Sequence, residues 1–499
     1  TPENTDLSFV VIQHLSPDYK SLMNELLARC TNIPIHLASD GLKIQKNNIY
    51  LIPPRKNIRL FHNKLYLEDQ NFKKGLNLPV DIFFHSLAQE KGKHAIGIIL
   101  SGTGSDGTLG TKAIKEAGGM IMVQDENSAK FDGMPKNSIA TGLVDYIISP
   151  DKMPEALINF VKHPLIKKNE LQESLKSENI DTLSKIVILI REYSGIDFSY
   201  YKENTILRRL ERRISINRFD TIEEYLKFLT ESSKEKEILN RELLIGVTRF
   251  FRDYEAFESI KRNVIPDLAL KKHLRIWSAG CSTGEEVYSL AILLNEHLEK
   301  NQIDTEVKIF ATDVDRNSVE FASKGVYPES VMADVDPVLL AKYFIRYENT
   351  YQIVDKIRKM IVFATHNLLK DSPFSKIDLL ICRNLFIYLK PEIQKKILSV
   401  FYYSLSTEGY LFMGSSETIG ELAEAFNCVD TKWKIYQQKH GFKPSILKEL
   451  SFIPQKLPDT DKLYFHQYKQ IEGVKFEKLF NYLLSRVLPP SVILDSQEN

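Results

Sequence analysis

The sequence predicts an α/β multidomain protein, with a small all-helical domain between two domains that are built on parallel sheets. Three observations lead to this prediction. The chain has 499 residues, which is too long for one hydrophobic core. Short apolar runs alternate with helical patterns over 1–162 and 263–440, whereas 183–262 shows helical periodicity alone. We expect a polar linker at 163–182, and a second linker with the start of another domain at 441–499.

Bulk composition excludes several function classes. The 66 basic and 65 acidic residues balance, so charge does not indicate a nucleic-acid partner. The four cysteines are far apart and form no C-x-x-C pair, so we expect neither a disulfide framework nor a metal site. No apolar run reaches the roughly 18 residues of a membrane span, and no signal peptide opens the chain. We therefore expect a cytoplasmic protein without membrane insertion.

The strands expected in residues 1–162 are short and apolar. They are FVVIQHL, NNIYLIPP, HAIGIILSG, GMIMVQD and VDYIIS, and SLMNELLARC and LGTKAIKEAG between them have a helical period. Such alternation is typical of a largely parallel sheet. His14 follows the first strand, and Asp106 lies in a glycine-rich turn after another. A histidine at a strand end is more often structural than catalytic, so this pair alone leaves its role open.

Residues 263–440 repeat the alternation, with strands expected at LRIWSAG, VKIFATDVD, MIVFATHNL, IDLLICRN and GYLFMGSS. The turn after the first of these strands, GCSTG, fits two patterns. One is the nucleophile elbow of a hydrolase, with Ser282 as nucleophile and His366 and Asp313 as nominal partners. The other is the glycine turn that leads a nucleotide-binding strand into its helix.

The second pattern makes the sharper prediction, because an acid should end the next strand and bind ribose hydroxyls. Asp313 stands in that place. Glu285 and Glu286 follow the turn and would repel a pyrophosphate, so the ligand should be neutral or cationic there. S-adenosyl-L-methionine has a ribose, an ammonium and a sulfonium but no phosphate, and it fits these charges.

Five motifs of this region resemble, in order, those of CheR, the chemotaxis receptor-glutamate methyltransferase. They are VTRFFRD, WSAGCSTGEEVYSLA, FATDVD, HNLL and CRNLFIYL, and the resemblance covers about residues 180–438. It implies a helical CheR N-terminal domain and a Rossmann-like methyltransferase domain. It also implies S-adenosyl-L-methionine binding by Thr248, Arg252, Glu285, Asp313, Asn367, Leu368, Arg383 and Asn384. Gly246 replaces an asparagine that is usual in the family, so one ligand contact is missing or replaced.

The reaction implied by the resemblance is methyl esterification of glutamate side chains on chemoreceptor or receptor-like helices. A glutamate has a pKa of about 4.3, so it is already an anion at neutral pH and needs no general base. Methylation of DNA bases is the weaker interpretation, because no proline follows Asn384 to help grip a flipped base. Two alternatives stay open: a regulatory module that binds the cofactor without turnover, and a hydrolase that uses Ser282.

The segment RRLERRISINR carries arginines at helical offsets. For an isolated charge run, a solvated face paired with local glutamates is the ordinary explanation. The resemblance to CheR instead implies receptor binding by this face, because an arginine-rich helix suits acidic methylation helices. The residues expected to bind the receptor are Arg208, Arg209, Arg212 and Arg213.

The motifs QHLSP, SGTGSDG and MPKNSIATGLVDYII resemble the catalytic domain of CheB, the receptor-glutamate methylesterase, over residues 7 to about 160. The resemblance implies that His14 is the general base and Asp106 its orienting carboxylate. The family's nucleophilic serine lies on a turn before that histidine, and this sequence has no such turn. Ser16, Ser101 and Ser105 belong to other loops. We therefore expect the methylesterase to be inactive in this chain.

The last residues, LPPSVILDSQEN, resemble the first strand of a PAS sensory domain. The order CheB-like, CheR-like and PAS-like is typical of fused regulators in bacterial chemotaxis-like signalling. A histidine kinase that acts through the PAS-containing remainder is therefore a further expected partner.

Overall fold

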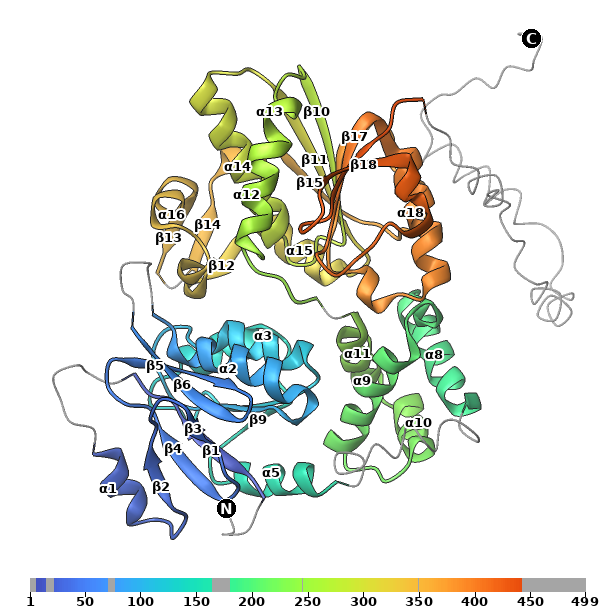
Figure 1. The fold of residues 1–499 in the computed structure, drawn as a ribbon. Coiled ribbons are helices and arrows are strands. Elements are labelled where there is room, and N and C mark those ends of the chain that lie inside the picture. Colours follow the sequence, from blue (N-terminus) through green and yellow to red (C-terminus); the bar gives the residue numbers. More distant parts are fainter. Residues whose placement is uncertain are drawn as a thin grey trace, which may run out of the picture. The chain divides into compact units, whose positions relative to one another are not determined.

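The computed structural model describes residues 6–14, 22–70, 77–163, 180–244, 246–348 and 350–441 (Figure 1). Residues Thr1–Ile446 form one unit, and Leu447–Asn499 form a second unit that lies outside the described residues. Most of the expected linker at 163–182 and nearly all of 441–499, including the expected PAS strand, also lie outside them.

The N-terminal domain, residues 6–163, contains three small sheets. Two are parallel, with strand orders β1-β4-β2 and β7-β8-β9, and one is antiparallel, with order β3-β6-β5. The strands are β1 Ser8–Val11, β2 Ile35–Leu37, β3 Leu42–Lys43, β4 Asn48–Leu51, β5 Lys56–Phe61, β6 Lys64–Asp69, β7 Ile96–Ile99, β8 Met120–Gln124 and β9 Tyr146–Ile148. The parallel sheets confirm the predicted class, whereas the antiparallel sheet was not predicted.

The helices of this domain are α1 Met23–Ala28, α2 Pro79–Lys91, α3 Thr108–Glu116, α4 Gly133–Ala140 and α5 Met153–Lys162. Phe83 and Phe84 of α2 and Ile114 of α3 are buried in a core with residues of β5 and β8. Strand β8 is buried along its length, which is typical of a parallel strand covered on both faces. Helices α2 and α3 therefore have fixed positions over the sheets, with their N-termini at the glycine-rich turn.

The helical domain, residues 180–244, consists of α8 Ile180–Ser194, α9 Glu203–Ile216, α10 Ile222–Glu231 and α11 Ser233–Leu244, with a short 3-10 turn at Phe198–Tyr200. The predicted end at residue 262 is too late. Helix α12, Tyr254–Asn263, buries Phe257 and Ile260 in the core of the following domain, against side chains of α14. Periodicity shows that α12 has an apolar face, but it does not show which domain that face packs against.

The seven-stranded domain, residues 246–441, has a sheet of order β15-β11-β10-β16-β17-β19-β18, parallel except where β19 pairs with its neighbours. The strands are β10 His273–Ala279, β11 Glu306–Asp313, β15 Ile361–Thr365, β16 Ile377–Cys382, β17 Leu405–Met413, β18 Phe426–Asp430 and β19 Ile435–Gln438. The chain runs outward from β10 on one side and returns beside it as β16. This reversal of strand order is the usual place for a ligand crevice, and it confirms the Rossmann-like prediction.

Helices on this sheet are α12, α13 Ile265–Leu268, α14 Glu285–Asn301, α15 Arg316–Lys324, α17 Asp355–Arg358 and α18 Pro391–Ser404. A small antiparallel sheet between α15 and β15 was not predicted, and it comprises β12 Val326–Pro328, β13 Phe344–Tyr347 and β14 Thr350–Ile353 with helix α16 Pro337–Tyr343. Figure 1 shows helices on both faces of the large sheet.

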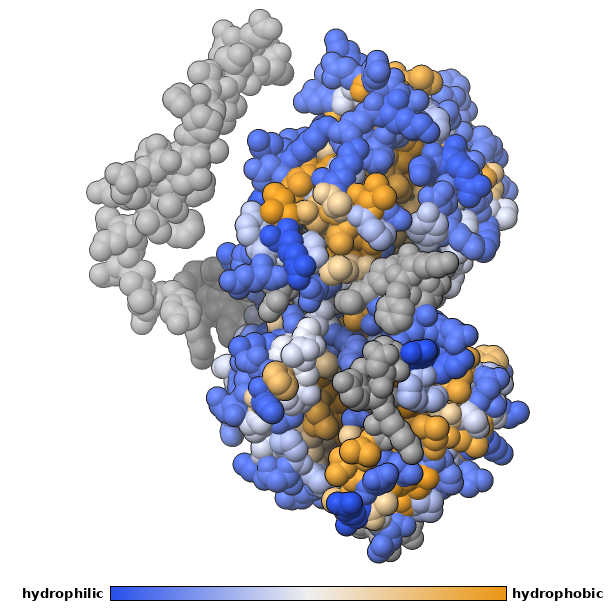
Figure 2. Space-filling view, turned by 90° about the vertical axis from the view of Figure 1, so that its left-hand side faces the viewer, coloured by the Kyte–Doolittle hydropathy of each residue, from blue (hydrophilic) through white to orange (hydrophobic). Residues whose placement is uncertain are grey.

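Hydropathy of the surface is mixed. Figure 2 shows one face, on which hydrophilic residues predominate and apolar residues form separate patches. Among the described residues, no helix combines the length and apolar character needed to cross a membrane.

Candidate active site

The glycine turn between β10 and α14 adopts a left-handed backbone at three positions. The φ angles of Gly280, Ser282 and Gly284 are 77°, 47° and 93°. The N–H of Gly280 donates to Thr312 O at 2.8 Å, which joins the turn to the end of β11. A Cβ atom on Gly284 would lie 2.8 Å from the Ala322 Cβ, so only glycine fits there. The turn is therefore fixed at the carboxyl ends of two neighbouring strands.

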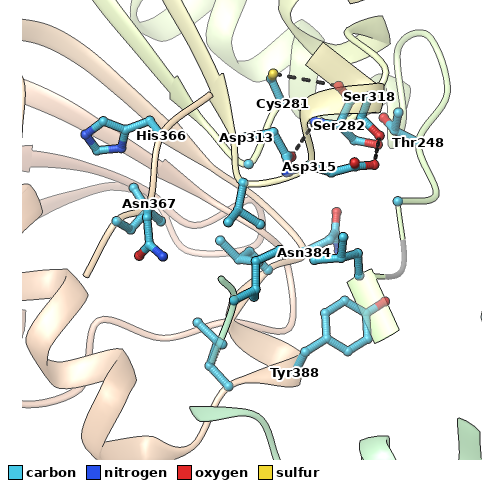
Figure 3. Close-up of a pocket in the computed structure, with 18 of the residues that line it drawn as sticks. Thr248, Cys281, Ser282, Asp313, Asp315, Ser318, His366, Asn367, Asn384 and Tyr388 are labelled. Atoms are coloured by element: carbon cyan, nitrogen blue, oxygen red, sulfur yellow. Dashed lines mark hydrogen bonds between the residues drawn. The ribbon is translucent and has the colours of Figure 1, made fainter. Parts of the chain in front are cut away.

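Asp313 ends β11 and faces this turn. Its carboxylate accepts hydrogen bonds from the backbone N–H groups of Ser282, at 2.8 Å, and Asp315, at 3.0 Å. Burial raises the pKa of Asp313, and these backbone hydrogen bonds oppose the shift. Figure 3 shows the carboxylate beside Ser282 in the pocket. The strand-end acid thus has a fixed orientation before any ligand binds.

One pocket at the strand ends collects most of the residues that were predicted to bind the cofactor. Those that line it are Thr248, Arg252, Asp313, Asn367, Leu368, Arg383 and Asn384. Thr248 and Arg252 come from the segment before α12, and the others follow β11, β15 and β16. Sequence positions more than a hundred residues apart therefore meet at one edge of the sheet.

Glu285 is the predicted residue that does not line the pocket. Its carboxylate accepts a hydrogen bond from Thr283 Oγ1 at 2.6 Å and pairs with Lys112 Nζ at 3.4 Å. Its neighbour Glu286 lines the pocket instead. Adjacent residues of a helix point about 100° apart, and Glu286 is the one directed to the pocket here.

Arg383 is a buried anchor for this acid. Its side chain is 1% exposed, and it donates to Glu286 and to Asp253, both at 2.7 Å. The guanidinium also lies 4.7 Å from the ring centroid of Phe412. Arg383 therefore links the end of β16 to the first turn of α14 and to the segment before α12.

Asn384 is held in place by Glu417. Asn384 has a φ of 58°, and its N–H donates to the Glu417 carboxylate at 3.1 Å. The same carboxylate accepts from the N–H groups of Phe386 and Gly414, both at 2.7 Å. Burial raises the pKa of Glu417, while these hydrogen bonds favour its anion. One carboxylate thereby joins the loop after β16 to the loop after β17.

Further lining residues were missed from the sequence. They are Ile196, Asp197, Tyr200 and Tyr201 of the helical domain, with Asp315, Ser318 and Tyr388 of the seven-stranded domain. Burial, followed by the charge of Glu116, raises the pKa of Tyr388 to about 12, so its hydroxyl is neutral at physiological pH. Asp315 and Tyr388 lie within motifs that were recognised, but the contribution of the helical domain has no signal in the sequence.

The lining of the pocket carries excess negative charge. Its charged side chains are the carboxylates of Asp197, Glu286, Asp313 and Asp315 and the guanidiniums of Arg252 and Arg383. Each carboxylate already accepts a hydrogen bond from a backbone N–H, a hydroxyl or a guanidinium. The pocket therefore favours a cationic ligand over a phosphate, and these hydrogen bonds orient its carboxylates while leaving them acceptor sites for a ligand.

A hydrolase with Ser282 as its nucleophile would need a hydrogen bond from the serine to a base, and the described residues do not form one. The hydroxyl of Ser282 is buried without a hydrogen-bond partner among the described residues. His366 lines the same pocket, but its Nε2 is paired with Ser372 O at 3.1 Å. A nucleophilic serine requires a base within hydrogen-bond reach. Gly246, which replaces the usual asparagine, also lines the pocket, and a Cβ there would lie 3.1 Å from Ser282 Oγ.

A second polar pair occupies the N-terminal domain. His14 Nε2 lies 2.8 Å from Asp106 Oδ2, and this hydrogen bond raises the pKa of His14. Asp106 is 2% exposed and accepts from the N–H groups of Val80 and Asp81, in the first turn of α2, at 3.0 and 2.9 Å. The positive end of that helix stabilises the carboxylate.

No hydroxyl among the described residues hydrogen-bonds to His14. Ser101 Oγ is paired with the backbone of Phe131, and Ser105 is buried with an unpartnered hydroxyl. Thr103 lies exposed in the glycine-rich turn, and Ser16 lies outside the described residues. The described residues thus place a histidine beside a buried carboxylate, with no hydroxyl hydrogen-bonded to the histidine.

The expected free basic face on α9 is not present. Arg209 donates to the backbone oxygens of Lys115 and Glu116 at 2.6 and 3.2 Å. Arg212 pairs with Asp145 and with Glu242, at 3.1 Å from the latter. Arg213 binds Glu235 at 2.7 Å, and Arg208 is half-buried beside Gly118. Arg209, Arg212 and Arg213 thus have partners, most of them far away in the sequence, and are buried, so these three arginines do not form an exposed docking surface here.

Comparison with known proteins identifies the class of the site. A family model described as "CheR methyltransferase, SAM binding domain" matches residues 246–435, which include the pocket except for its helical-domain residues. The fold and the pocket thus define an S-adenosylmethionine-dependent methyltransferase. The model "CheR methyltransferase, all-alpha domain" matches residues 181–244, and "CheB methylesterase" matches residues 1–157.

Proteins with similar sequences lead to the same class. A chemotaxis protein methyltransferase of Borreliella burgdorferi is 32% identical over 250 residues, covering 48% of this chain and 88% of the relative. The chain therefore belongs to the CheR family of methyltransferases, fused here to a CheB methylesterase domain. A 104.1 kDa protein of Rhodobacter capsulatus is 36% identical over 443 residues, or 83% of this chain, and the chain spans 46% of its length. Among solved structures, the Thermotoga maritima CheB methylesterase catalytic domain is 27% identical, covers 32% of this chain and 85% of its own, and has a TM-score of 0.29.

Proposed function

We propose that this protein transfers the methyl group of S-adenosylmethionine to glutamate side chains of chemoreceptors or receptor-like proteins. The observation that carries the proposal is the negatively charged pocket, in which each lining carboxylate is already hydrogen-bonded. Relatives named chemotaxis protein methyltransferases, from Borreliella burgdorferi and Vibrio cholerae, support the assignment of the acceptor.

The residues of the pocket have distinct roles in this proposal. Asp313 accepts hydrogen bonds from the ribose hydroxyls, and Glu286 takes the place first assigned to Glu285. Arg383 holds Glu286 in position. The remaining contacts come from Thr248, Arg252, Asn367, Leu368 and Asn384. The side chains of Tyr201 and Tyr388 exclude water from the mouth of the pocket, because both rings line it and are largely buried.

The bound cofactor supplies a methyl group on a positively charged sulfur. The acceptor oxygen forms a bond to that carbon while the carbon–sulfur bond breaks, and no proton moves because the acceptor is already an anion. The chain therefore contributes positioning and water exclusion rather than a general base. This requirement matches a pocket whose carboxylates are all engaged.

Calorimetric titration with S-adenosylhomocysteine, followed by transfer of tritiated methyl groups to receptor-containing membranes, tests the proposal. Saturable binding with base-labile label in the receptor fraction is expected. Binding without transfer favours the second candidate, a regulatory scaffold that holds the cofactor without turnover. The replacement of the usual asparagine by Gly246 is the observation that favours this candidate.

For the N-terminal domain, we propose that His14 and Asp106 belong to a methylesterase centre. Because no hydroxyl of the described residues binds His14, we expect this chain to hydrolyse no methyl esters. Assay of a glutamate methyl ester peptide checks this expectation, and measurable turnover would contradict it. A cytoplasmic location and a histidine kinase partner that acts through a PAS domain also remain proposals.

A further inference from the structure

Helix α3 of the N-terminal domain presents three charged side chains to the methyltransferase. Lys112, Lys115 and Glu116 are spaced so that they share one face of the helix. Lys112 pairs with Glu285 at 3.4 Å, and Lys115 with Glu242 at 3.3 Å. Both lysines are nearly buried, with 18% and 5% of their side chains exposed. This face of α3 is therefore docked and largely shielded from solvent.

The end of α3 is held by the arginine-rich helix α9. Arg209 donates to the terminal carbonyls of Lys115 and Glu116, where the helix dipole favours a cation. The next glycine, Gly118, has a φ of 85°, and a Cβ there would lie 3.1 Å from the Arg208 side chain. The two helices thus approach closely at the last turn of α3.

Glu116 extends from this turn toward the methyltransferase pocket. Its carboxylate lies 3.3 Å from Arg252 Nη2 and 3.4 Å from the Tyr388 hydroxyl. Both partners line the pocket, whereas Glu116 itself does not. The Glu116 side chain is 29% exposed and Arg252 is 22% exposed, so the pair is partly shielded from water. A glutamate on a helix therefore occupies the mouth of a pocket whose proposed acceptor is a glutamate on a helix.

We propose that α3 acts as a competitor in cis of the methyl acceptor, with Glu116 occupying the place of the acceptor carboxylate. The inference rests on the proposed function, because it requires that the acceptor bind at Arg252 and Tyr388. Methyl transfer then requires displacement of the CheB-like domain from α9. The same displacement would free Arg209 to bind an acidic helix.

The test compares the binding of one probe to three forms of the full chain. The probe is a fluorescent synthetic helical peptide with glutamates at i and i+4 spacing, measured by anisotropy with saturating S-adenosylhomocysteine. Glu116→Gln removes the charge but keeps the side-chain shape. Glu155→Gln is the matched control. Glu155 belongs to the same domain and pairs at 3.8 Å with Arg218, in the turn that follows α9. Neither of these two residues is among those that line the pocket.

We expect Glu116→Gln to bind the peptide about fivefold more tightly than the wild type, with Glu155→Gln unchanged. Arg252 keeps its hydrogen bond to Val247 O, so the affinity for S-adenosylhomocysteine should stay within about twofold. Equal peptide affinity in the three forms would overturn the inference.

Two further outcomes separate this inference from the proposed function. A wild-type chain that does not bind S-adenosylhomocysteine would contradict the proposed function itself. A chain that binds it, with no gain of peptide affinity in Glu116→Gln, would contradict only the competition. Mass spectrometry after incubation with S-adenosylmethionine should find Glu116 unmodified, because a methyl ester there would show an acceptor and not a competitor.

Discussion

Arg383 donates a hydrogen bond of 2.7 Å to Glu286, and this pair joins the end of β16 to the first turn of α14 across the pocket. The second arm of the guanidinium binds Asp253 at the same distance. Arg383 and Asp253 thereby fix the orientation of Glu286, the one of the two adjacent glutamates that lines the pocket.

Replacement of Arg383 by methionine should lower both stability and cofactor affinity. Two carboxylates would lose their buried cation, which costs about 3 kcal/mol in the free energy of unfolding. S-adenosylhomocysteine should bind roughly tenfold more weakly, because Glu286 loses its anchor. Chemical denaturation and calorimetry measure the two effects. Arg316→Met is the control, since its pair with Glu320 is exposed and should contribute less than about 1 kcal/mol.

Gly284→Ala should destabilise the seven-stranded domain by about 3 kcal/mol. Gly284 has a left-handed backbone, which alanine adopts only with strain. The new Cβ would also lie 2.8 Å from Ala322 and 3.0 Å from the Tyr327 hydroxyl. Gly420→Ala is the matched control, because Gly420 also has a positive φ but no atom within 4 Å of its Cβ position. It should cost only about 1 kcal/mol. Equal losses in thermal unfolding would contradict the role of crowding at residue 284.

Ser282→Ala distinguishes the methyltransferase from the hydrolase interpretation. The Ser282 hydroxyl is buried and has no hydrogen-bond partner in the described part of the chain, so its removal should leave stability and S-adenosylhomocysteine affinity nearly unchanged. Loss of a measurable ester hydrolysis activity in this variant, with full cofactor affinity, would instead support Ser282 as a nucleophile.

His14 should titrate above its ordinary pKa of 6.5, because it donates to the buried carboxylate of Asp106. A raised pKa in the folded protein means that this pair stabilises the fold fully below pH 6.5 and loses that effect as pH rises through the raised value. NMR titration of the His14 ring measures the midpoint. Asp106→Asn should lower it, and a wild-type midpoint below 6.5 would contradict the prediction.

Much of the methyltransferase site could be predicted from the sequence, because its residues follow strand ends. The glycine turn and Asp313 stand at neighbouring parallel strands, and such ends meet at one edge of a sheet. The sequence assigned Glu285 to the site, whereas Glu286 is the residue that lines the pocket, and this difference depends on the rotation of α14 about its axis. Rotation is set by packing against residues that are distant in the sequence, among them Arg383.

The arginines of α9 show the limit of local patterns. A charge run with this spacing indicates a solvated face, yet Arg212 is 2% exposed. Its partners Asp145 and Glu242 lie 67 and 30 residues away. The sequence did not predict that Tyr201 lines the pocket, because Tyr201 belongs to the helical domain and is far in the sequence from the strand ends. The antiparallel strands β5 and β6 were missed, although Ile58 and Leu60, and Leu65 and Leu67, stand at alternate positions on either side of a two-residue turn with positive φ.

Glu417 joins two loops that belong to different strands, since its carboxylate holds Asn384, Phe386 and Gly414 together. Neither loop can shift without breaking hydrogen bonds to a buried anion or carrying the other loop with it. Other parts of the lining, Thr248 and Tyr200 of the 3-10 turn Phe198–Tyr200, are not tied to this carboxylate. The lining of the crevice thus combines two loops that can move only together with residues that a separate helical domain supplies.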